Sequence, residues 1–270
     1  SRISSLAMRV VPAKNGWLWL VRGFALFRKS PPMWLLLVFA YWIAASLLGQ
    51  IRYVGPAAST VLLPAFFVSF MVMCAVLDRG GLLRPGLLFS GFRSGLSTLI
   101  ALGVLSLVSI VVVLGVASLA DSGALMTLIL SGQQPPVEAL QDGSVLSAML
   151  VATLAATPVA MAFWFAPVLA AWNRIGAAQS LFYSFFAVWR NWRAFFVYGA
   201  VLALAGAVFL VILTFAAFLL QERMQVVHSL ALILTLLSWP TLFASLYASY
   251  RDIFPENAVP AEPPSNRESP

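Results

Sequence analysis

Six long apolar runs, each about the length of a membrane-spanning helix, dominate this sequence of 270 residues. A helix rises about 1.5 Å per residue, so roughly 20 apolar residues cross the roughly 30 Å hydrocarbon core of a bilayer. None of the runs alternates polar and apolar residues as a barrel strand does, and helices satisfy their own backbone hydrogen bonds in lipid. We therefore predict an all-α, polytopic membrane protein with six transmembrane helices, over residues 32–51, 58–77, 96–120, 145–172, 195–220 and 226–250.

The composition excludes the class of water-soluble globular proteins. Hydrophobic residues make up 61% of the chain and charged residues only 9%, and a soluble core cannot hide that much apolar surface. The formal net charge is +7, but no basic soluble domain is present to bind nucleic acid. We expect no nucleic-acid partner, and we interpret the positive charge as a signal of membrane topology.

Lysine and arginine are concentrated in four segments of the chain. These segments lie before the first run, between the second and third, between the fourth and fifth, and after the sixth; only Arg52 and Arg223 of the 16 cations lie elsewhere. Cations resist translocation and collect on the cytoplasmic side. The longest loop on the opposite side, residues 121–143, carries three acidic residues and no cation. This distribution predicts a multi-pass protein with both the N-terminus and the C-terminus in the cytoplasm.

A short motif, Phe-x-x-(Phe or Trp)-Arg, occurs three times, each time shortly before an odd-numbered run. The copies FALFR, FSGFR and FAVWR occupy residues 24–28, 89–93 and 186–190. The even-numbered runs share a second pattern, because each contains a proline and ends with Asp or Asn beside Arg. Two patterns that recur at equivalent positions indicate an internal repeat.

The predicted architecture is therefore three hairpins of transmembrane helices, each preceded by a cytoplasmic interfacial amphipathic helix. Repeat 2 has the weakest interfacial helix, because its glycines loosen it. The predicted units are an N-terminal tail at 1–12, repeat 1 at 13–79, repeat 2 at 80–174, repeat 3 at 175–252 and a disordered cytoplasmic tail at 253–270.

The first interfacial helix is expected over residues 15–30. Its rings and leucine form an apolar stripe at helical spacing that can lie along the membrane surface. Asn15 is expected to cap the start of this helix, and two prolines end it and turn the chain into the bilayer. The stripe consists of Trp17, Leu20, Phe24 and Phe27.

Rings at the membrane boundary and cations that reach the headgroups fix the depth of each hairpin. The expected cations at the interface or on lipid headgroups are Arg22, Arg28, Lys29, Arg93, Arg190 and Arg193. The expected aromatic anchors are Trp17, Phe24, Phe27, Phe89, Phe92, Phe186 and Trp189. Two interpretations stay open, namely a plain membrane anchor or a specific docking site for an anionic lipid or a partner.

The fourth run carries small residues at a spacing of four. Small side chains let the backbones of membrane helices approach closely. We therefore expect this run to lie in the centre of the bundle or at a partner interface, through Ala152, Ala156, Ala160, Ala162, Ala166 and Ala170.

Residues that could carry chemistry are scarce. No Asp, Glu, Lys or Arg lies in the middle of a predicted span, which disfavours an ion-coupled transporter. His228 is the single histidine and Cys74 the single cysteine, which excludes a histidine metal cluster and an internal disulfide. Asp78 could bind a cation, although pairing with Arg79 or capping is the simpler interpretation. We expect no catalytic, cofactor-binding or metal-binding residue, and we predict that the protein is not an enzyme.

The stretch RVVPAKNGWLWLVRGFALFRKSPPMW, residues 9–34, carries a family resemblance. Its order of Val-Pro-Ala, Gly-Trp-x-Trp, Phe-Arg and Pro-x-x-Trp resembles the opening of a family of uncharacterised multi-spanning inner-membrane proteins of betaproteobacteria. The pattern of interfacial helix plus hairpin is also similar to the membrane domain of bacterial glycerophosphodiester phosphodiesterases, but these 270 residues do not include the soluble domain that holds their metal-binding carboxylates. The resemblance implies the bacterial cytoplasmic membrane and transfers no catalytic residue.

Two functional hypotheses follow. The preferred one is a non-enzymatic accessory, scaffold or assembly component that binds another membrane protein or envelope lipids, with anionic headgroups on the cytoplasmic side. It rests on the lack of charge in the spans, the small-residue run and the basic surface helices. The alternative is a permease or flippase for an apolar or lipid-like molecule, which needs no ionisable residue in its path.

Overall fold

The computed structural model describes residues 6–52, 54–131, 143–220 and 223–255, and these residues form helices and loops without a strand. The elements are α1 (Asn15–Phe27), α2 (Pro31–Gly49), α3 (Gly55–Asp78), the 3-10 helix η1 (Pro85–Arg93), α4 (Leu96–Asp121), α5 (Ala124–Ser131), α7 (Ser144–Phe163), α8 (Ala166–Asn173), α9 (Ala177–Arg190), α10 (Trp192–Leu219) and α11 (Met224–Ile253). The disordered tail predicted at 253–270 lies outside the described residues from 256 onward, and most of the loop at 131–143 lies outside them too.

Six helical segments of the described chain are long and apolar enough to cross a membrane. They are α2, α3, α4, the pair α7 and α8, α10 and α11. This finding confirms the all-α class and the six spans, with ends within a few residues of the predicted ones. The grouping into repeats and the interfacial position of the short helices stay predictions at this point.

Proline residues mark where several of these helices begin and where one of them breaks. Pro31 and Pro32 open α2, a position where the missing N–H costs nothing. The fourth run, predicted as one helix, is interrupted between Phe163 and Ala166. Pro167 explains the break, because it has no N–H to donate to the carbonyl group four residues earlier.

A serine from α9 makes hydrogen bonds across the break between α7 and α8. The hydroxyl of Ser184 donates to the carbonyl of Met161 at 2.8 Å and accepts from the backbone N–H of Phe165 at 2.9 Å. The hydroxyl therefore bridges two backbone groups that a continuous helix would have joined directly. This bridge fixes α9 against the kinked fourth span.

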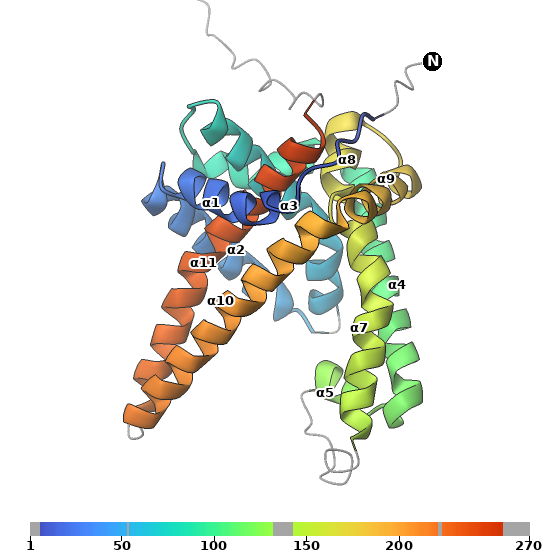
Figure 1. The fold of residues 1–270 in the computed structure, drawn as a ribbon, viewed down its shortest axis with the longest axis vertical. Coiled ribbons are helices and arrows are strands. Elements are labelled where there is room, and N and C mark those ends of the chain that lie inside the picture. The colour runs from blue at the N-terminus through green and yellow to red at the C-terminus, as the bar shows by residue number, and fades with distance from the viewer. Residues whose placement is uncertain (1–5, 53, 132–142, 221–222, 256–270) are drawn as a thin grey trace, which may run out of the picture.

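The buried core lies at one end of the molecule, which we call the terminal face because the described chain begins and ends there (Figure 1). The C-terminal parts of α3, α8 and α11 meet in this core. Its rings interlock, with Phe70 stacked on Phe243 at 4.2 Å and Trp172 edge-on to Tyr250 at 5.2 Å between ring centroids. α3 is the most enclosed of the spans.

Away from the terminal face the helices separate. α10 and α11 run together toward one far corner, whereas α4 and α7 run together toward another (Figure 1). Along α7, the side of the helix with Ala148 and Ala152 packs against Ala117 and Leu125. The molecule is thus tightly packed at one end and divided into separate helix pairs at the other.

α1 contacts both α10 and α11, and two of its glycines allow this close approach. A side chain at Gly16 would collide with the backbone of Ala194 in α10. A Cβ atom at Gly23 would lie 2.6 Å from the backbone nitrogen of Ser245 in α11. Only glycine at these positions lets the helix backbones touch.

We predict that Gly23→Ala lowers the melting temperature of the detergent-solubilised protein, because the added methyl group forces α1 away from α11. Overpacking of this kind costs about 1–3 kcal/mol of unfolding free energy. The matched control is Gly199→Ala in α10, where an added Cβ meets no atom within 4 Å and should leave the melting temperature unchanged or raise it. Equal melting curves for Gly23→Ala and wild type would contradict the proposed close contact.

Candidate functional site

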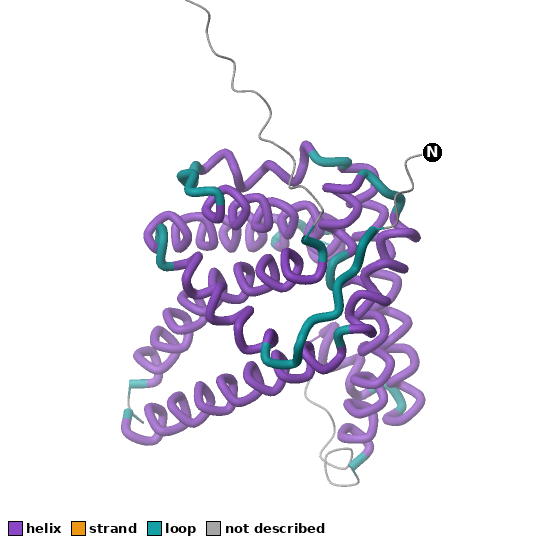
Figure 2. Tube along the Cα trace, turned by 45° about the horizontal axis from the view of Figure 1, so that its top comes forward, coloured by secondary structure: helices purple, strands orange, loops and turns teal. Residues whose placement is uncertain are grey.

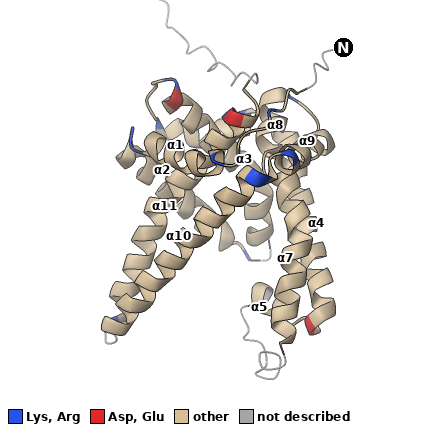
Figure 3. Ribbon diagram, in the orientation of Figure 1, with Lys and Arg blue, Asp and Glu red and all other residues tan. Residues whose placement is uncertain are grey.

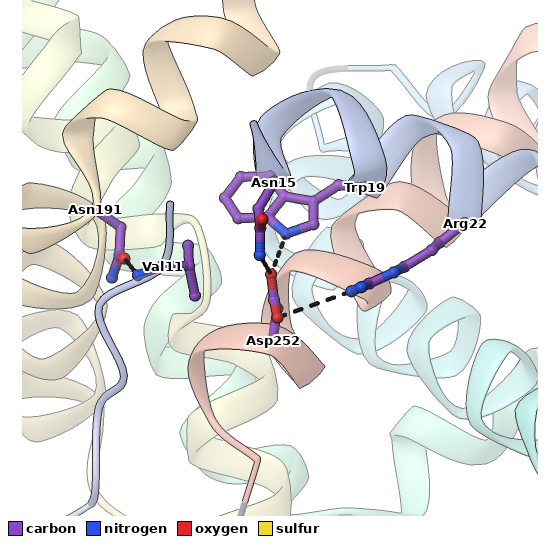
Figure 4. A network of polar contacts seen from close by, with 6 residues as sticks. All are labelled: Val11, Asn15, Trp19, Arg22, Asn191 and Asp252. Carbon is purple, nitrogen blue, oxygen red and sulfur yellow. Dashed lines mark hydrogen bonds and ion pairs between the residues drawn. The ribbon is translucent and has the colours of Figure 1, made fainter. Parts of the chain in front are cut away.

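The carboxylate of Asp252, at the end of α11, anchors α1 (Figure 4). Its Oδ2 atom accepts hydrogen bonds from Asn15 Nδ2 at 2.7 Å and from Trp19 Nε1 at 2.9 Å. The guanidinium of Arg22 lies 3.7 Å from Oδ1, in a partly exposed ion pair. Trp19 is completely buried and packs on Phe195 of α10. One acidic side chain therefore joins the first and last helices of the described chain.

Asn15 was expected to cap α1, and this expectation is wrong. Lys14 is the N-cap residue and no side chain caps the helix. Asn15 is the first residue of α1, and its amide is used for the bond to Asp252. The tertiary acceptor is the better partner because it is charged and partly buried, which strengthens a hydrogen bond.

The segment before α1, residues 6–14, is a strap that runs along the terminal face as a loop (Figure 2). The backbone N–H of Arg9 donates to the carbonyl of Ile253 at 2.8 Å. The buried Asn191, between α9 and α10, holds the strap from the other side. Its Oδ1 accepts from Val11 N–H at 2.8 Å (Figure 4), and its Nδ2 donates to the carbonyl of Arg9 at 3.0 Å.

Two further polar contacts tie the end of α3 to its neighbours. Tyr247 of α11 donates its hydroxyl to Asp78 Oδ2 at 2.9 Å. Lys29, which follows α1, donates to the carbonyl of Leu77 at 2.9 Å. Asp78 therefore accepts a hydrogen bond from another span. The sequence allows a cation site, a pair with Arg79 or a cap at this residue, but it does not indicate this contact.

The described cations lie mostly at the terminal face (Figure 3). All of the predicted headgroup cations are exposed there, on α1 and the turn after it, at the end of η1, and at the turn between α9 and α10. The guanidinium of Arg28 lies over the ring of Phe24 at 5.9 Å, and that of Arg193 over Trp192 at 5.6 Å. The predicted cations are thus distributed over three elements of the face and do not form a single cluster.

The predicted aromatic anchors divide into exposed and half-buried side chains. Trp17, Phe24, Phe89, Phe186 and Trp189 are exposed, whereas Phe27 and Phe92 are half-buried. On α1, the stripe that faces the protein is a different one, made of Asn15, Gly16, Trp19, Gly23 and Leu26. The predicted stripe lies beside it, because Leu20 and Phe27 pack partly against the core whereas Trp17 and Phe24 are exposed. Its contact with lipid stays a prediction.

The predicted small-residue row does not lie on one continuous helix, because the break at Phe163 divides it between α7 and α8. Ala152 packs against α4, Ala156 and Ala162 are half-buried, and Ala160 is exposed. Ala166 and Ala170 are buried in α8. The row is therefore divided between two helices, and its role in helix packing stays a prediction.

Sequence reasoning missed Asn191 and the joint role of Asn15, Trp19 and Asp252. The available signal was the repeated Asp or Asn at the end of each even-numbered run, which marked Asp252 without indicating its partner. Within the described part of the chain, no three His, Cys, Asp or Glu residues gather as a metal site would require. The site is thus a set of helix-to-helix contacts under an exposed layer of cations and rings.

A comparison with known proteins identifies a relative of this chain. The chain is similar to a protein of Burkholderia thailandensis described as a "Probable inner membrane protein", with 34% identity over 253 residues, which cover 90% of this chain and 92% of the relative. No protein-family model and no solved structure matches the chain. The relative confirms the predicted resemblance to betaproteobacterial inner-membrane proteins, whereas the likeness to the phosphodiesterase membrane domain stays a prediction.

We predict that Asp252→Ala lowers the melting temperature in detergent, because it leaves the buried donors of Asn15 and Trp19 without an acceptor, at a cost of about 1–3 kcal/mol. Asp252→Asn is the matched control, since its amide oxygen can still accept both bonds. A smaller decrease is expected for Asp252→Asn, because a neutral amide oxygen accepts hydrogen bonds more weakly than a carboxylate. If both variants melted at the same lowered temperature, the carboxylate's charge rather than the two hydrogen bonds would hold α1.

Proposed function

Since the chain belongs to the same family as this inner membrane protein of Burkholderia thailandensis, it is a multi-pass inner membrane protein, and we propose that it acts there as a non-enzymatic accessory, scaffold or assembly component that binds a membrane partner or envelope lipids. The observation that carries the proposal is the exposure of α10. Six consecutive residues, 203–208, are all exposed, and six residues make more than one complete helical turn. Every side of this part of α10 is therefore exposed in the described protein. Its apolar surface is free to contact lipid or another helix.

The acidic residues support a non-enzymatic role. The three that the structure describes all accept hydrogen bonds from protein groups: Asp78 from Tyr247, Asp252 from α1, and Asp121 from the backbone N–H groups of Gly123 and Leu125 at 2.9 and 2.6 Å. Acid–base catalysis needs titratable groups within reach of a substrate. Each of these carboxylates instead connects or ends helices.

We also propose that the molecule consists of three repeated units with the predicted bounds, residues 13–79, 80–174 and 175–252, between tails at 1–12 and 253–270. The support is a cyclic pattern of contacts. η1 of the second unit packs on α3 of the first, α9 of the third packs on α7 and α8 of the second, and α1 of the first packs on α11 of the third. Each surface helix thus rests on the second span of the preceding unit, and the pattern closes on itself.

The contact points of two of these surface helices correspond in sequence. In α3, the site lies at Ala65 and Ser69, one and five residues after Pro64. In α11, it lies at Thr241 and Ser245, one and five residues after Pro240. A glycine of the surface helix, Gly91 or Gly23, meets the backbone at each site, which is the arrangement expected of a repeated unit.

The proposed orientation places the terminal face and both termini in the cytoplasm. The support is the concentration of cations on this face (Figure 3), because cations are retained on the cytoplasmic side during insertion. In this orientation α1, η1 and α9 lie at the level of the headgroups, where exposed rings beside cations are favourable. Their role as interfacial amphipathic helices belongs to the same proposal.

A permease or flippase for an apolar or lipid-like molecule is the second candidate. The observation in its favour is the divergence of the α10–α11 pair from the α4–α7 pair (Figure 1). Helices that separate in the membrane give lipids lateral access to the space beside them. The rings packed at the terminal face would have to rearrange before a molecule could cross.

The proposed role predicts a partner or retained lipid at α10. A photo-crosslinking amino acid at Leu204, which is 67% exposed, should give a discrete adduct in native membranes, and the protein in mild detergent should retain a partner or lipid in native mass spectrometry. The control position is Val111 in α4, which is 56% exposed and should give only dispersed lipid adducts. A monomer with no retained molecule and equal adducts at both positions would argue against the role. Transfer of fluorescent phospholipid between leaflets of protein-containing liposomes would favour the flippase.

The proposed orientation predicts different labelling of two introduced cysteines in spheroplasts. Arg223→Cys, between α10 and α11, should react with a membrane-impermeant maleimide, whereas Leu82→Cys, between α3 and η1, should react only after the membrane is opened. Wild type is the control, because its single cysteine, Cys74, is completely buried. The reverse labelling pattern would place the termini in the periplasm.

A further inference from the structure

The strap and the turn between α9 and α10 bring four cations from distant parts of the sequence to one corner of the terminal face. Arg9 and Lys14 come from the strap, and Arg190 and Arg193 flank Asn191. The two segments are joined by the hydrogen bonds of Asn191 to Val11 N–H and to the carbonyl of Arg9. Gly16, which follows the strap, packs on the backbone of Ala194. We call these four residues the cationic corner.

No described acidic side chain balances the charge of the cationic corner. All four cations are exposed, and none forms an ion pair with an acid among the described residues. Asp252 already accepts from Asn15 and Trp19 and faces Arg22. In the sequence, no Asp or Glu occurs between Asp142 and Glu222, the whole stretch that contains α8, α9 and α10. The corner therefore presents positive charge that an anion from outside the described protein can neutralise.

Exposed rings surround the same corner. Trp189 and Trp192 are 61% and 58% exposed, and Phe196, one turn further along α10, is 70% exposed. The guanidinium of Arg193 lies over the ring of Trp192, which keeps the cation beside the aromatic surface. A free phosphate ion makes no contact with this apolar surface. A phospholipid contacts both the cations and the rings, because its phosphate and its acyl chains are joined in one molecule.

We propose that the cationic corner binds the phosphate of an anionic phospholipid of the surrounding leaflet, with the acyl chains along the exposed start of α10. The inference rests on the proposed function for the membrane position of the terminal face. Arginine can grip phosphate oxygens with two parallel N–H groups, and lysine adds a compact point charge. Because the strap carries half of the cations, the site is complete only when the strap is bound to Asn191.

The test is a lipid titration of the full-length protein in detergent, followed by native mass spectrometry, with dioleoylphosphatidylglycerol as the probe and dioleoylphosphatidylcholine as the neutral comparison. Wild type should retain one phosphatidylglycerol in preference to phosphatidylcholine. Arg9→Gln with Lys14→Gln, or Arg190→Gln with Arg193→Gln, should each weaken this binding about tenfold. The matched control, Arg79→Gln with Arg84→Gln, removes two exposed cations between α3 and η1 and should change binding less than about twofold.

A single shared site also predicts that the two pairs act on the same bound lipid. Either double replacement should weaken retention of the same single phosphatidylglycerol, and replacement of all four cations should remove the preference over phosphatidylcholine. Two phosphatidylglycerol molecules bound to wild type, with one lost on replacing each pair, would mean two separate patches and would overturn the proposal, as would equal losses in the control variant. Binding of inorganic phosphate that displaces the lipid at millimolar concentration would show that the acyl chains do not contribute, which also overturns it.

The outcome separates this inference from the proposed function. If phosphatidylglycerol binds no better than phosphatidylcholine while the adduct at Leu204 persists, the headgroup site is wrong and the scaffold role stands. If the corner binds lipid but α10 yields no specific adduct, the partner at α10 is wrong and the lipid site stands. Melting temperatures of all variants, measured alongside, show whether a loss of binding reflects unfolding.

Discussion

The docking of α1 onto α10 and α11 is the interaction on which the terminal half of the molecule depends. α10 and α11 touch each other less than each of them touches α1, so the short helix holds the two long ones together at this end. Its seat requires close backbone approach at Gly16 and Gly23, a buried indole at Trp19 and a carboxylate at Asp252. These four features lie on two helices at opposite ends of the described chain, so neither helix can take its position without the other.

A bilayer supplies no hydrophobic force between helices, so packing and polar contacts must hold them together. The terminal half has both, in its interlocked rings and in the bonds made by Ser184, Tyr247 and Asn191. The far part of α10 has much less of either, because most of its side chains there are apolar and exposed. This division suits a component that is firmly assembled at one membrane face and offers helix surface to other molecules deeper in the lipid.

The spans could be predicted from sequence because their length is set by the bilayer, whatever the helices pack against. The contacts at the terminal face could not, because they join residues that lie far apart in the chain, such as Asn15 and Asp252. On α1, rings occur on two stripes, and the sequence alone favoured the one with Trp17 and Phe24. The stripe with Trp19 is the one that packs on the protein, and its signal was the presence of Gly16 and Gly23 beside a large ring, which indicates close approach of another backbone.

The docking of α1 onto α10 and α11 also sets an order of events during synthesis. α1 is translated before α10 and α11, yet these two helices form its docking surface, roughly 200 residues later along the chain. At about 5–20 residues per second, the ribosome needs on the order of tens of seconds to supply that surface. During this interval the nascent helix keeps its indole and glycine stripe uncovered, because the two helices that bury them in the folded protein have yet to be translated.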